Sequence, residues 1–173
     1  MHDLLSGLPV PRTREPIGDG AVVLRGFVSA CASELLRNVE LIRAAAPFRH
    51  LTTPGGHVMS VAMTNCGDLG WVSDRRGYRY QRVDPLSGQS WPTMPGAFRS
   101  VAAEAAEAAG YAPFAPEACL INRYEPGARL SLHQDRDELD LDAPIVSVSL
   151  GLPAVFLLAC RTLNGRHAIK YRR

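Results

Sequence analysis

The chain has 173 residues, of which 46% are hydrophobic and 21% charged, a composition typical of one soluble globular domain. It contains no run of about 18 apolar residues, so we predict no membrane-spanning helix. The N-terminus lacks a basic start followed by an apolar stretch, which favours a cytoplasmic protein. The net charge of +2 is too small to indicate nucleic-acid binding by itself.

The cysteines Cys31, Cys66, Cys119 and Cys160 are far apart in the sequence. None forms the CxxC pair that is typical of a zinc site, and no short regular spacing indicates a disulfide framework. We therefore predict reduced thiols, as expected for the cytoplasm.

The first 47 residues predict one strand and one helix. The segment up to Asp19 contains three prolines, so we expect it to be extended and loosely packed. Residues 21–28 (AVVLRGFV) have the β-branched content and the length of a strand. Ser29 is a suitable N-cap for a helix that runs towards Ala46, and Pro47 ends it.

The middle of the chain predicts hairpins followed by a second helix. Turn-forming residues punctuate residues 52–95, with strand-like pieces at 57–64 and 78–83. Residues 98–109 are rich in alanine and predict a helix, with Gly110 as its C-terminal stop.

The last third of the chain returns to a β pattern. Strands are predicted at residues 119–124, 129–135, 145–153 and 154–160, separated by tight turns and one acidic loop. Short antiparallel strands of this kind are typical of a sandwich or jelly roll. With helices early and strands late, the sequence predicts an α+β fold.

The spacing of His133 and Asp135 indicates a metal site. Two positions apart on a strand, their side chains share a face and are about 6.6 Å apart along the chain, while Leu130 and Leu132 face the core. With one further histidine, this pair makes the facial triad that holds non-heme iron(II). A lone HxD is a weak signal, however, and a surface histidine beside an acidic loop is the alternative.

Three longer segments around this motif resemble the AlkB family of iron(II)- and 2-oxoglutarate-dependent dioxygenases. They are residues 53–80 (TPGGHVMSVAMTNCGDLGWVSDRRGYRY), 119–138 (CLINRYEPGARLSLHQDRDE) and 143–156 (APIVSVSLGLPAVF). The resemblance covers roughly residues 20–156 and is far more specific than a bare HxD. It implies a jelly-roll (double-stranded β-helix) core with N-terminal helices and a nucleotide-recognition lid.

The resemblance also implies residue roles. His133 and Asp135 match iron ligands and the catalytic centre, and Asn122 and Tyr124 match residues that bind 2-oxoglutarate. Five residues match positions that contact the damaged nucleotide, namely Met63, Trp71, Tyr78, Asp137 and Glu138.

Taken without the resemblance, these residues have ordinary alternatives. Met63, Trp71 and Tyr78 are side chains that commonly fill a core. Asn122 is a common turn-capping amide and Tyr124 a common buried strand aromatic. Asp137 and Glu138 belong to an acidic run of the kind that is usually a solvated loop.

We expect a single domain over residues 1–173. Residues 20–95 form the N-terminal extension and lid, residues 111–160 a partial jelly roll, and residues 161–173 a divergent basic tail. The tail holds five basic residues and no acidic one, including Lys170, the only lysine of the chain.

After Phe156 we expect the resemblance to end. The family's closing strands, its second ligand histidine and its arginines for 2-oxoglutarate are then missing, and His167 comes too early to replace that histidine. We therefore expect weak or absent activity, exposed apolar faces and poor stability. A tail translated in another frame, or a disrupted gene, is our hypothesis for this ending.

The resemblance predicts a dioxygenase that demethylates 1-methyladenine and 3-methylcytosine in single- or double-stranded DNA or in RNA. It implies Fe(II), 2-oxoglutarate and O₂ as cofactors and co-substrates, and a monomer that has no membrane partner. The alternative within the family is a non-catalytic nucleic-acid-binding remnant. A structural metal site in a cupin-like fold is a third hypothesis, against which the long match at residues 119–138 argues.

Overall fold

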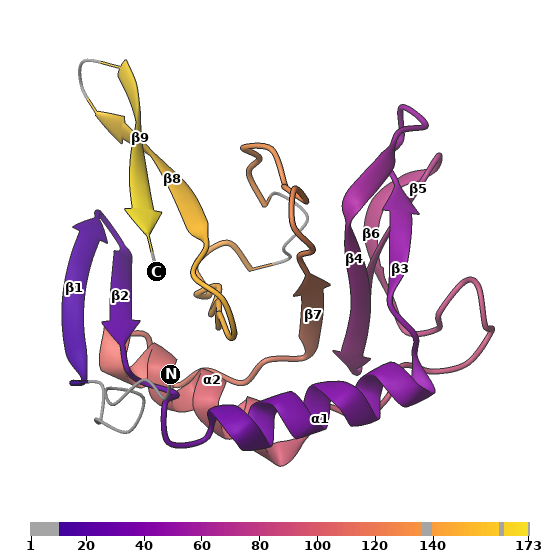
Figure 1. The fold of residues 1–173 in the computed structure, drawn as a ribbon, viewed down its shortest axis with the longest axis horizontal. Coiled ribbons are helices and arrows are strands. Elements are labelled where there is room, and N and C mark those ends of the chain that lie inside the picture. Colours follow the sequence, from indigo (N-terminus) through magenta and orange to yellow (C-terminus); the bar gives the residue numbers. More distant parts are fainter. Residues whose placement is uncertain (1–10, 136–139, 163–164, 173) are drawn as a thin grey trace, which may run out of the picture.

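The computed structural model describes residues 11–135, 140–162 and 165–172, with side chains as far as Leu158. Two helices lie along one side of the molecule, and antiparallel strands rise from them in two groups (Figure 1). The irregular segment that follows β7 (Ala118–Arg123) runs between these groups (Figure 1). No described helix has the length and apolar character that a membrane crossing requires.

One group consists of a three-stranded sheet, in which β4 (Val58–Gly67) lies between β3 (Arg49–Thr52) and β7, and of the hairpin formed by β5 (Gly70–Asp74) and β6 (Gly77–Gln81). The other group consists of two hairpins, one formed by β1 (Thr13–Gly18) and β2 (Ala21–Arg25) and one by β8 (Val155–Thr162) and β9 (Gly165–Arg172). All strand pairs between these elements are antiparallel. The two helices are α1 (Ala32–Ala45) and α2 (Gly96–Ala109).

Both predicted helices are present, but the first begins differently from expectation. The N-cap of α1 is Cys31, without a side-chain cap, so the prediction that Ser29 caps this helix is wrong. Leu35 and Ile42 are buried on its inner face, about two helical turns apart. α2 ends at Gly110, whose φ of +95° is the left-handed conformation that glycine adopts without strain.

The core lies on both faces of β4. Val61, Met63 and Cys66 are at most 2% exposed, and Cys66 lies opposite Cys119 of β7 in the sheet register. Both of these thiols are free, as is Cys31. A hydroxyl of β4 ties the sheet to the end of α1, because Thr64 Oγ1 donates a hydrogen bond of 2.7 Å to the Ala46 carbonyl.

Three sequence predictions need correction. Part of the segment before Asp19 is not loosely packed, since it forms β1 and pairs with β2. Residues 129–135 and 145–153 are not strands. A strand needs the backbone of a neighbouring strand as its hydrogen-bond partner. At Arg129 a side chain takes this place, because Ser60 Oγ donates to the Arg129 carbonyl at 2.9 Å and accepts from the Arg129 N–H at 3.1 Å.

Several large apolar side chains after Leu130 are exposed. Leu132 is 58% exposed and Leu152 is 89% exposed. Leu132 therefore does not enter the core, although Leu130 packs against the cluster of Leu51, Val61 and Met63 as predicted. The other exposed residues here are Leu141, Ile145, Val148, Val155, Phe156 and Leu157.

Candidate functional site

The HxD motif brings an imidazole and a carboxylate together in an irregular segment. Nε2 of His133 lies 3.4 Å from Oδ1 of Asp135, and both side chains are about half exposed, at 58% and 49%. On the other side of the ring, Nδ1 of His133 lies 2.7 Å from the carbonyl oxygen of Ser131. The backbone therefore holds the imidazole by one nitrogen and turns the other towards the carboxylate.

This contact determines which nitrogen can bind a metal. A carbonyl oxygen only accepts, so Nδ1 must carry the proton, and in neutral imidazole Nε2 then carries a lone pair. A lone pair facing a carboxylate is unfavourable unless the ring takes up a second proton or both groups bind the same cation. Metal-binding histidines commonly donate their second N–H to a backbone carbonyl in this way.

The distance between the two donor atoms also fits a metal ion. Neighbouring ligand atoms on a small divalent ion, with bonds of about 2.1 Å, are roughly 3 to 3.5 Å apart. His133 and Asp135 therefore fit two positions around iron(II). Among the residues that the structure describes, no three His, Cys, Asp or Glu side chains lie close enough together to bind one metal ion. A third protein ligand for this pair is therefore not found in the described part of the chain. His167 lies in β9, where its backbone pairs with Cys160.

Asn122 offers a buried polar group that has no hydrogen-bond partner among the described residues. It lies in β7 opposite Met63, and its buried Oδ1 accepts no hydrogen bond from a described residue. Because the two ends of an amide exchange by rotation of the group, the same position can present either an acceptor or an NH₂ donor. A buried amide without a partner is unfavourable, so this position fits the carboxylate of a bound co-substrate.

Tyr124 follows Asn122 just beyond the end of β7 and is 53% exposed. Partial burial raises the pKa of its phenol, so the hydroxyl stays protonated at neutral pH and can donate a hydrogen bond. Tyr124 is therefore not the buried strand aromatic of the alternative interpretation. It lies outside the strand that holds Asn122.

The aromatic residues of the predicted lid stack on one another. The rings of Trp71 on β5 and Tyr78 on β6 are 5.5 Å apart between centroids and inclined by 14°. Tyr78 is 45% exposed, whereas Trp71 packs against the buried cluster of Leu51, Val61 and Met63. Met63 is only 2% exposed, so it lies in the core beneath the lid, apart from the exposed ring of Tyr78.

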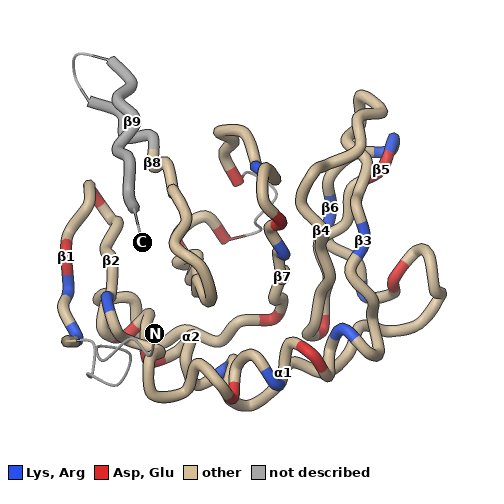
Figure 2. Tube along the Cα trace, viewed as in Figure 1, with Lys and Arg blue, Asp and Glu red and all other residues tan. Residues whose placement is uncertain are grey.

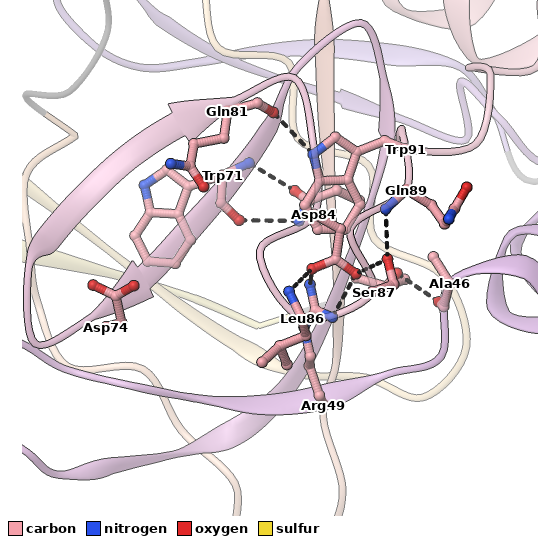
Figure 3. Close-up of polar contacts among 12 residues, drawn as sticks. Ala46, Arg49, Trp71, Asp74, Gln81, Asp84, Leu86, Ser87, Gln89 and Trp91 are labelled. Atoms are coloured by element: carbon pink, nitrogen blue, oxygen red, sulfur yellow. Dashed lines mark hydrogen bonds and ion pairs between the residues drawn. The ribbon is translucent and has the colours of Figure 1, made fainter.

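Several buried polar contacts fix the base of the lid hairpin (Figure 3). The amide of Asn65 donates to the Trp71 carbonyl and accepts the Trp71 N–H, both at 2.9 Å, and Asn65 is only 2% exposed. Trp91 donates through Nε1 to the Gln81 carbonyl at 2.9 Å. Its ring lies so close to Gly70 that an added Cβ would fall 2.3 Å from it.

Sequence reasoning missed these supporting residues. Asn65 and Trp91 have no spacing or motif that marks them, because their partners lie on other strands. Asp137 and Glu138, which were predicted to lie near the alkylated base, are outside the described residues.

Comparisons with known proteins identify the family of the chain. A sequence profile of the 2OG-Fe(II) oxygenase superfamily matches residues 20–171. The chain therefore belongs to this superfamily. The match includes part of the tail, beyond the point at which we expected the resemblance to end.

Curated relatives narrow the assignment. The alpha-ketoglutarate-dependent dioxygenase AlkB of Salmonella typhimurium is 61% identical over 143 residues, which is 83% of this chain and 66% of that protein. The protein of the same name from Escherichia coli is 57% identical over the same shares of both chains. Within the superfamily, the chain is a member of the AlkB family. It spans about two thirds of the length of these two relatives, 66% in each case.

A solved structure supports the fold. The structure of OsALKBH1 superposes with a TM-score of 0.76 at 24% sequence identity, over 92% of this chain and 78% of that one. The architecture is therefore that of the jelly-roll oxygenases, as the sequence resemblance predicted.

Proposed function

We propose that this chain carries the iron-binding and nucleotide-binding parts of a dioxygenase that demethylates alkylated bases in nucleic acid. The observation that carries the proposal is the pair formed by His133 and Asp135, 3.4 Å apart, within a sequence of the AlkB family. The buried Oδ1 of Asn122, which has no hydrogen-bond partner among the described residues, supports a co-substrate site at that position. The substrates are 1-methyladenine and 3-methylcytosine in single- or double-stranded DNA, and also in RNA.

In this proposal, four of the predicted residues bind the metal and the co-substrate, whereas Met63 supports the lid from the core. His133 and Asp135 hold Fe(II), and Asn122 and Tyr124 bind 2-oxoglutarate. Bound iron supplies the oxidation in which 2-oxoglutarate and O₂ become succinate and CO₂ while one oxygen atom enters the N-methyl group, which then leaves as formaldehyde. The chain's own residues hold the metal and the co-substrate and present an aromatic face to the base. The protein acts as a monomer in the cytoplasm.

The stacked rings of Trp71 and Tyr78 support a nucleic-acid base as the substrate. An alkylated base is out of reach inside a duplex, so an enzyme must flip it or act on single strands. The exposed ring of Tyr78, supported from behind by Trp71, provides a flat face for such a base. Asp137 and Glu138, if they lie beside the base, favour the positive charge that 1-methyladenine and 3-methylcytosine carry.

The proposal is tested by mixing the anaerobic chain with Fe(II), 2-oxoglutarate and a 1-methyladenine oligonucleotide, and then admitting air. We expect the oligonucleotide to lose one CH₂ unit from the methylated base, slowly because the described residues supply only two iron ligands, and to keep it when iron is omitted. Retention of the methyl group by soluble, folded protein with every component present would contradict the catalytic proposal. It would leave the non-catalytic nucleic-acid-binding remnant as the function to pursue.

Removing the stacking platform should weaken binding. Base–aromatic stacking contributes about 1–3 kcal/mol per base, so Trp71→Ala or Tyr78→Ala should lower the affinity for a single-stranded oligonucleotide by roughly 5- to 150-fold. Fluorescence anisotropy of a labelled oligonucleotide measures the change. Tyr111→Phe is the matched control, because that ring lies outside the lid and its hydroxyl binds the Gly20 carbonyl. Equal affinities for all these variants would show that the aromatic pair has only a structural role.

A further inference from the structure

Two cysteines that the proposed function does not use lie opposite each other in the sheet. Cys66 near the end of β4 pairs with Cys119 of β7 in the antiparallel register, and Cys119 packs against the core cluster that contains Cys66. Directly opposed residues of antiparallel strands have Cα atoms about 4.5–5.5 Å apart. Because disulfides span Cα separations of about 4.4–6.8 Å, the two strands hold these residues at a distance that a disulfide can bridge.

The two thiols differ in exposure and in acidity. Cys66 is 0% exposed, whereas Cys119 is only partly buried, so a small reagent from solvent reaches Cys119 first. A hydrogen bond between the thiols is the main cause that raises the pKa of Cys66 and lowers the pKa of Cys119. Burial raises the pKa of Cys66 further and partly opposes the change at Cys119. The proton therefore stays on Cys66, and Cys119 is the thiol that more readily becomes a nucleophilic thiolate.

The charge near the pair also favours a thiolate. β4 carries no charged residue between Val58 and Gly67 (Figure 2). The guanidinium of Arg99 on α2 does act on the pair, because its positive charge partly offsets the rise in the pKa of Cys66. A hydrogen bond of 3.1 Å from Arg99 Nη1 to the Pro116 carbonyl holds this guanidinium close to the start of β7. A partly exposed thiol near a cation is the kind of cysteine that reacts with oxidants.

We propose that Cys66 and Cys119 form a site of reversible oxidation, at which a small peroxide converts the two thiols to a disulfide that joins β4 to β7. The Cys119 thiolate attacks hydrogen peroxide, so that an S–O bond forms, the O–O bond breaks and hydroxide leaves. The Cys66 sulfur then attacks the resulting sulfenic acid. The S–S bond forms, the S–O bond breaks, and the oxygen leaves as water with the proton of Cys66. The peroxide takes two electrons, one from each sulfur, and an added dithiol returns them.

The test treats the folded, iron-free chain with hydrogen peroxide in the presence of a chelator, which keeps trace iron from generating other oxidants. The protein is then unfolded, its remaining thiols are alkylated with iodoacetamide, and it is digested with trypsin without reductant. We expect residues 50–75, which contain Cys66, to be joined to residues 100–123, which contain Cys119, with the loss of two hydrogen atoms from a chain that stays monomeric. Dithiothreitol added before the alkylation should separate the two peptides.

Cys31 is the matched control. It is also partly buried, but its thiol donates to the Val28 carbonyl at 3.5 Å instead of to another thiol, so it should remain reduced and be alkylated in full. Two variants separate the steps of the reaction. In Cys66→Ala, oxidation of Cys119 should stop at the sulfenic acid, which dimedone labels. In Cys119→Ala, the buried Cys66 should remain unlabelled.

Full alkylation of Cys66 and Cys119 in the peroxide-treated parent chain would contradict the proposal, and so would a disulfide that includes Cys31 or joins two chains. These outcomes do not depend on the proposed function, because the assay contains neither iron nor nucleic acid. Urea unfolding of the oxidised chain gives a second readout. The midpoint should move to a higher urea concentration, because the bond restricts the unfolded chain between β4 and β7. An unchanged or lower midpoint would show that the native sheet does not accommodate the bond and would overturn the site.

Discussion

Replacing His133 with alanine should lower the affinity of the chain for Fe(II) by more than about 100-fold and abolish demethylation. Loss of a residue that merely orients a metal ligand already costs about 10- to 100-fold in affinity, and His133 is expected to be a ligand. Its Nε2 lone pair faces Asp135 at 3.4 Å, an arrangement that a cation between the two groups stabilises. Anaerobic equilibrium dialysis against Fe(II) measures the affinity without any turnover.

His50 provides a matched control for this substitution. It is also an exposed histidine whose Nδ1 lies 2.9 Å from a backbone carbonyl, that of Met59, but no described carboxylate makes a salt bridge with it. His50→Ala should therefore leave iron binding unchanged. Equal iron affinity in the parent chain, His50→Ala and His133→Ala would rule out the HxD motif as the metal site.

Asp135→Asn tests how much of the iron affinity depends on the negative charge of Asp135, because asparagine has nearly the same shape. The amide keeps one oxygen near Nε2 of His133 but removes the negative charge that favours a divalent cation. We expect iron affinity between those of the parent chain and Asp135→Ala. Affinity equal to that of the parent chain would mean that Asp135 binds no metal.

Sequence patterns correctly predicted the elements whose determining residues are close together in the sequence. The helix over 98–109 and its stop at Gly110 follow from alanine content and from the left-handed conformation that glycine tolerates. The hairpin around Gly77 likewise depends on turn residues that are adjacent in the sequence. These parts could be predicted because their determinants lie within one turn or one helical repeat.

The HxD segment shows where such reasoning fails. The alternation around His133 is that of a strand, but the segment forms no ladder with a strand that the structure describes, and the side chain of Ser60 on β4 binds the backbone of Arg129 instead. The two site residues still meet, because the Ser131 carbonyl holds the imidazole. The sequence therefore predicted that these two side chains lie together, whereas the backbone that positions them depends on tertiary pairing.

The residues that support the lid were not predictable for the same reason. Arg49 and Asp84 are 35 positions apart, and nothing in the sequence joins them. In the structure they form a bidentate ion pair at 2.8 and 2.7 Å that links β3 to the loop after β6 (Figure 3). The guanidinium also lies over the ring of Trp91, 5.3 Å from its centroid, and Trp91 in turn holds Gln81.

Arg49→Ala should lower the free energy of unfolding by roughly 3 kcal/mol, because removing one partner of a buried ion pair leaves an uncompensated charge. The Asp84 side chain is 6% exposed, and only the N–H of Leu86 and the hydroxyl of Ser87 would remain as its donors. Urea unfolding measures the loss. Arg43→Ala, which breaks the exposed pair with Glu40, should change stability by less than about 1 kcal/mol.

The pH dependence shows whether the Asp84 charge causes this loss. Burial raises the pKa of Asp84, but the hydrogen bonds from Arg49, Leu86 and Ser87 outweigh it and lower the pKa overall. A lowered folded-state pKa contributes stability above the unfolded value of about 3.9, and this contribution is lost as the pH falls through the folded value. The deficit of Arg49→Ala should therefore be largest near neutral pH and shrink below about pH 4, where protonation removes the unpaired charge. A deficit of the same size at pH 7 and pH 3 would instead assign the loss to the packing of Arg49 on Trp91.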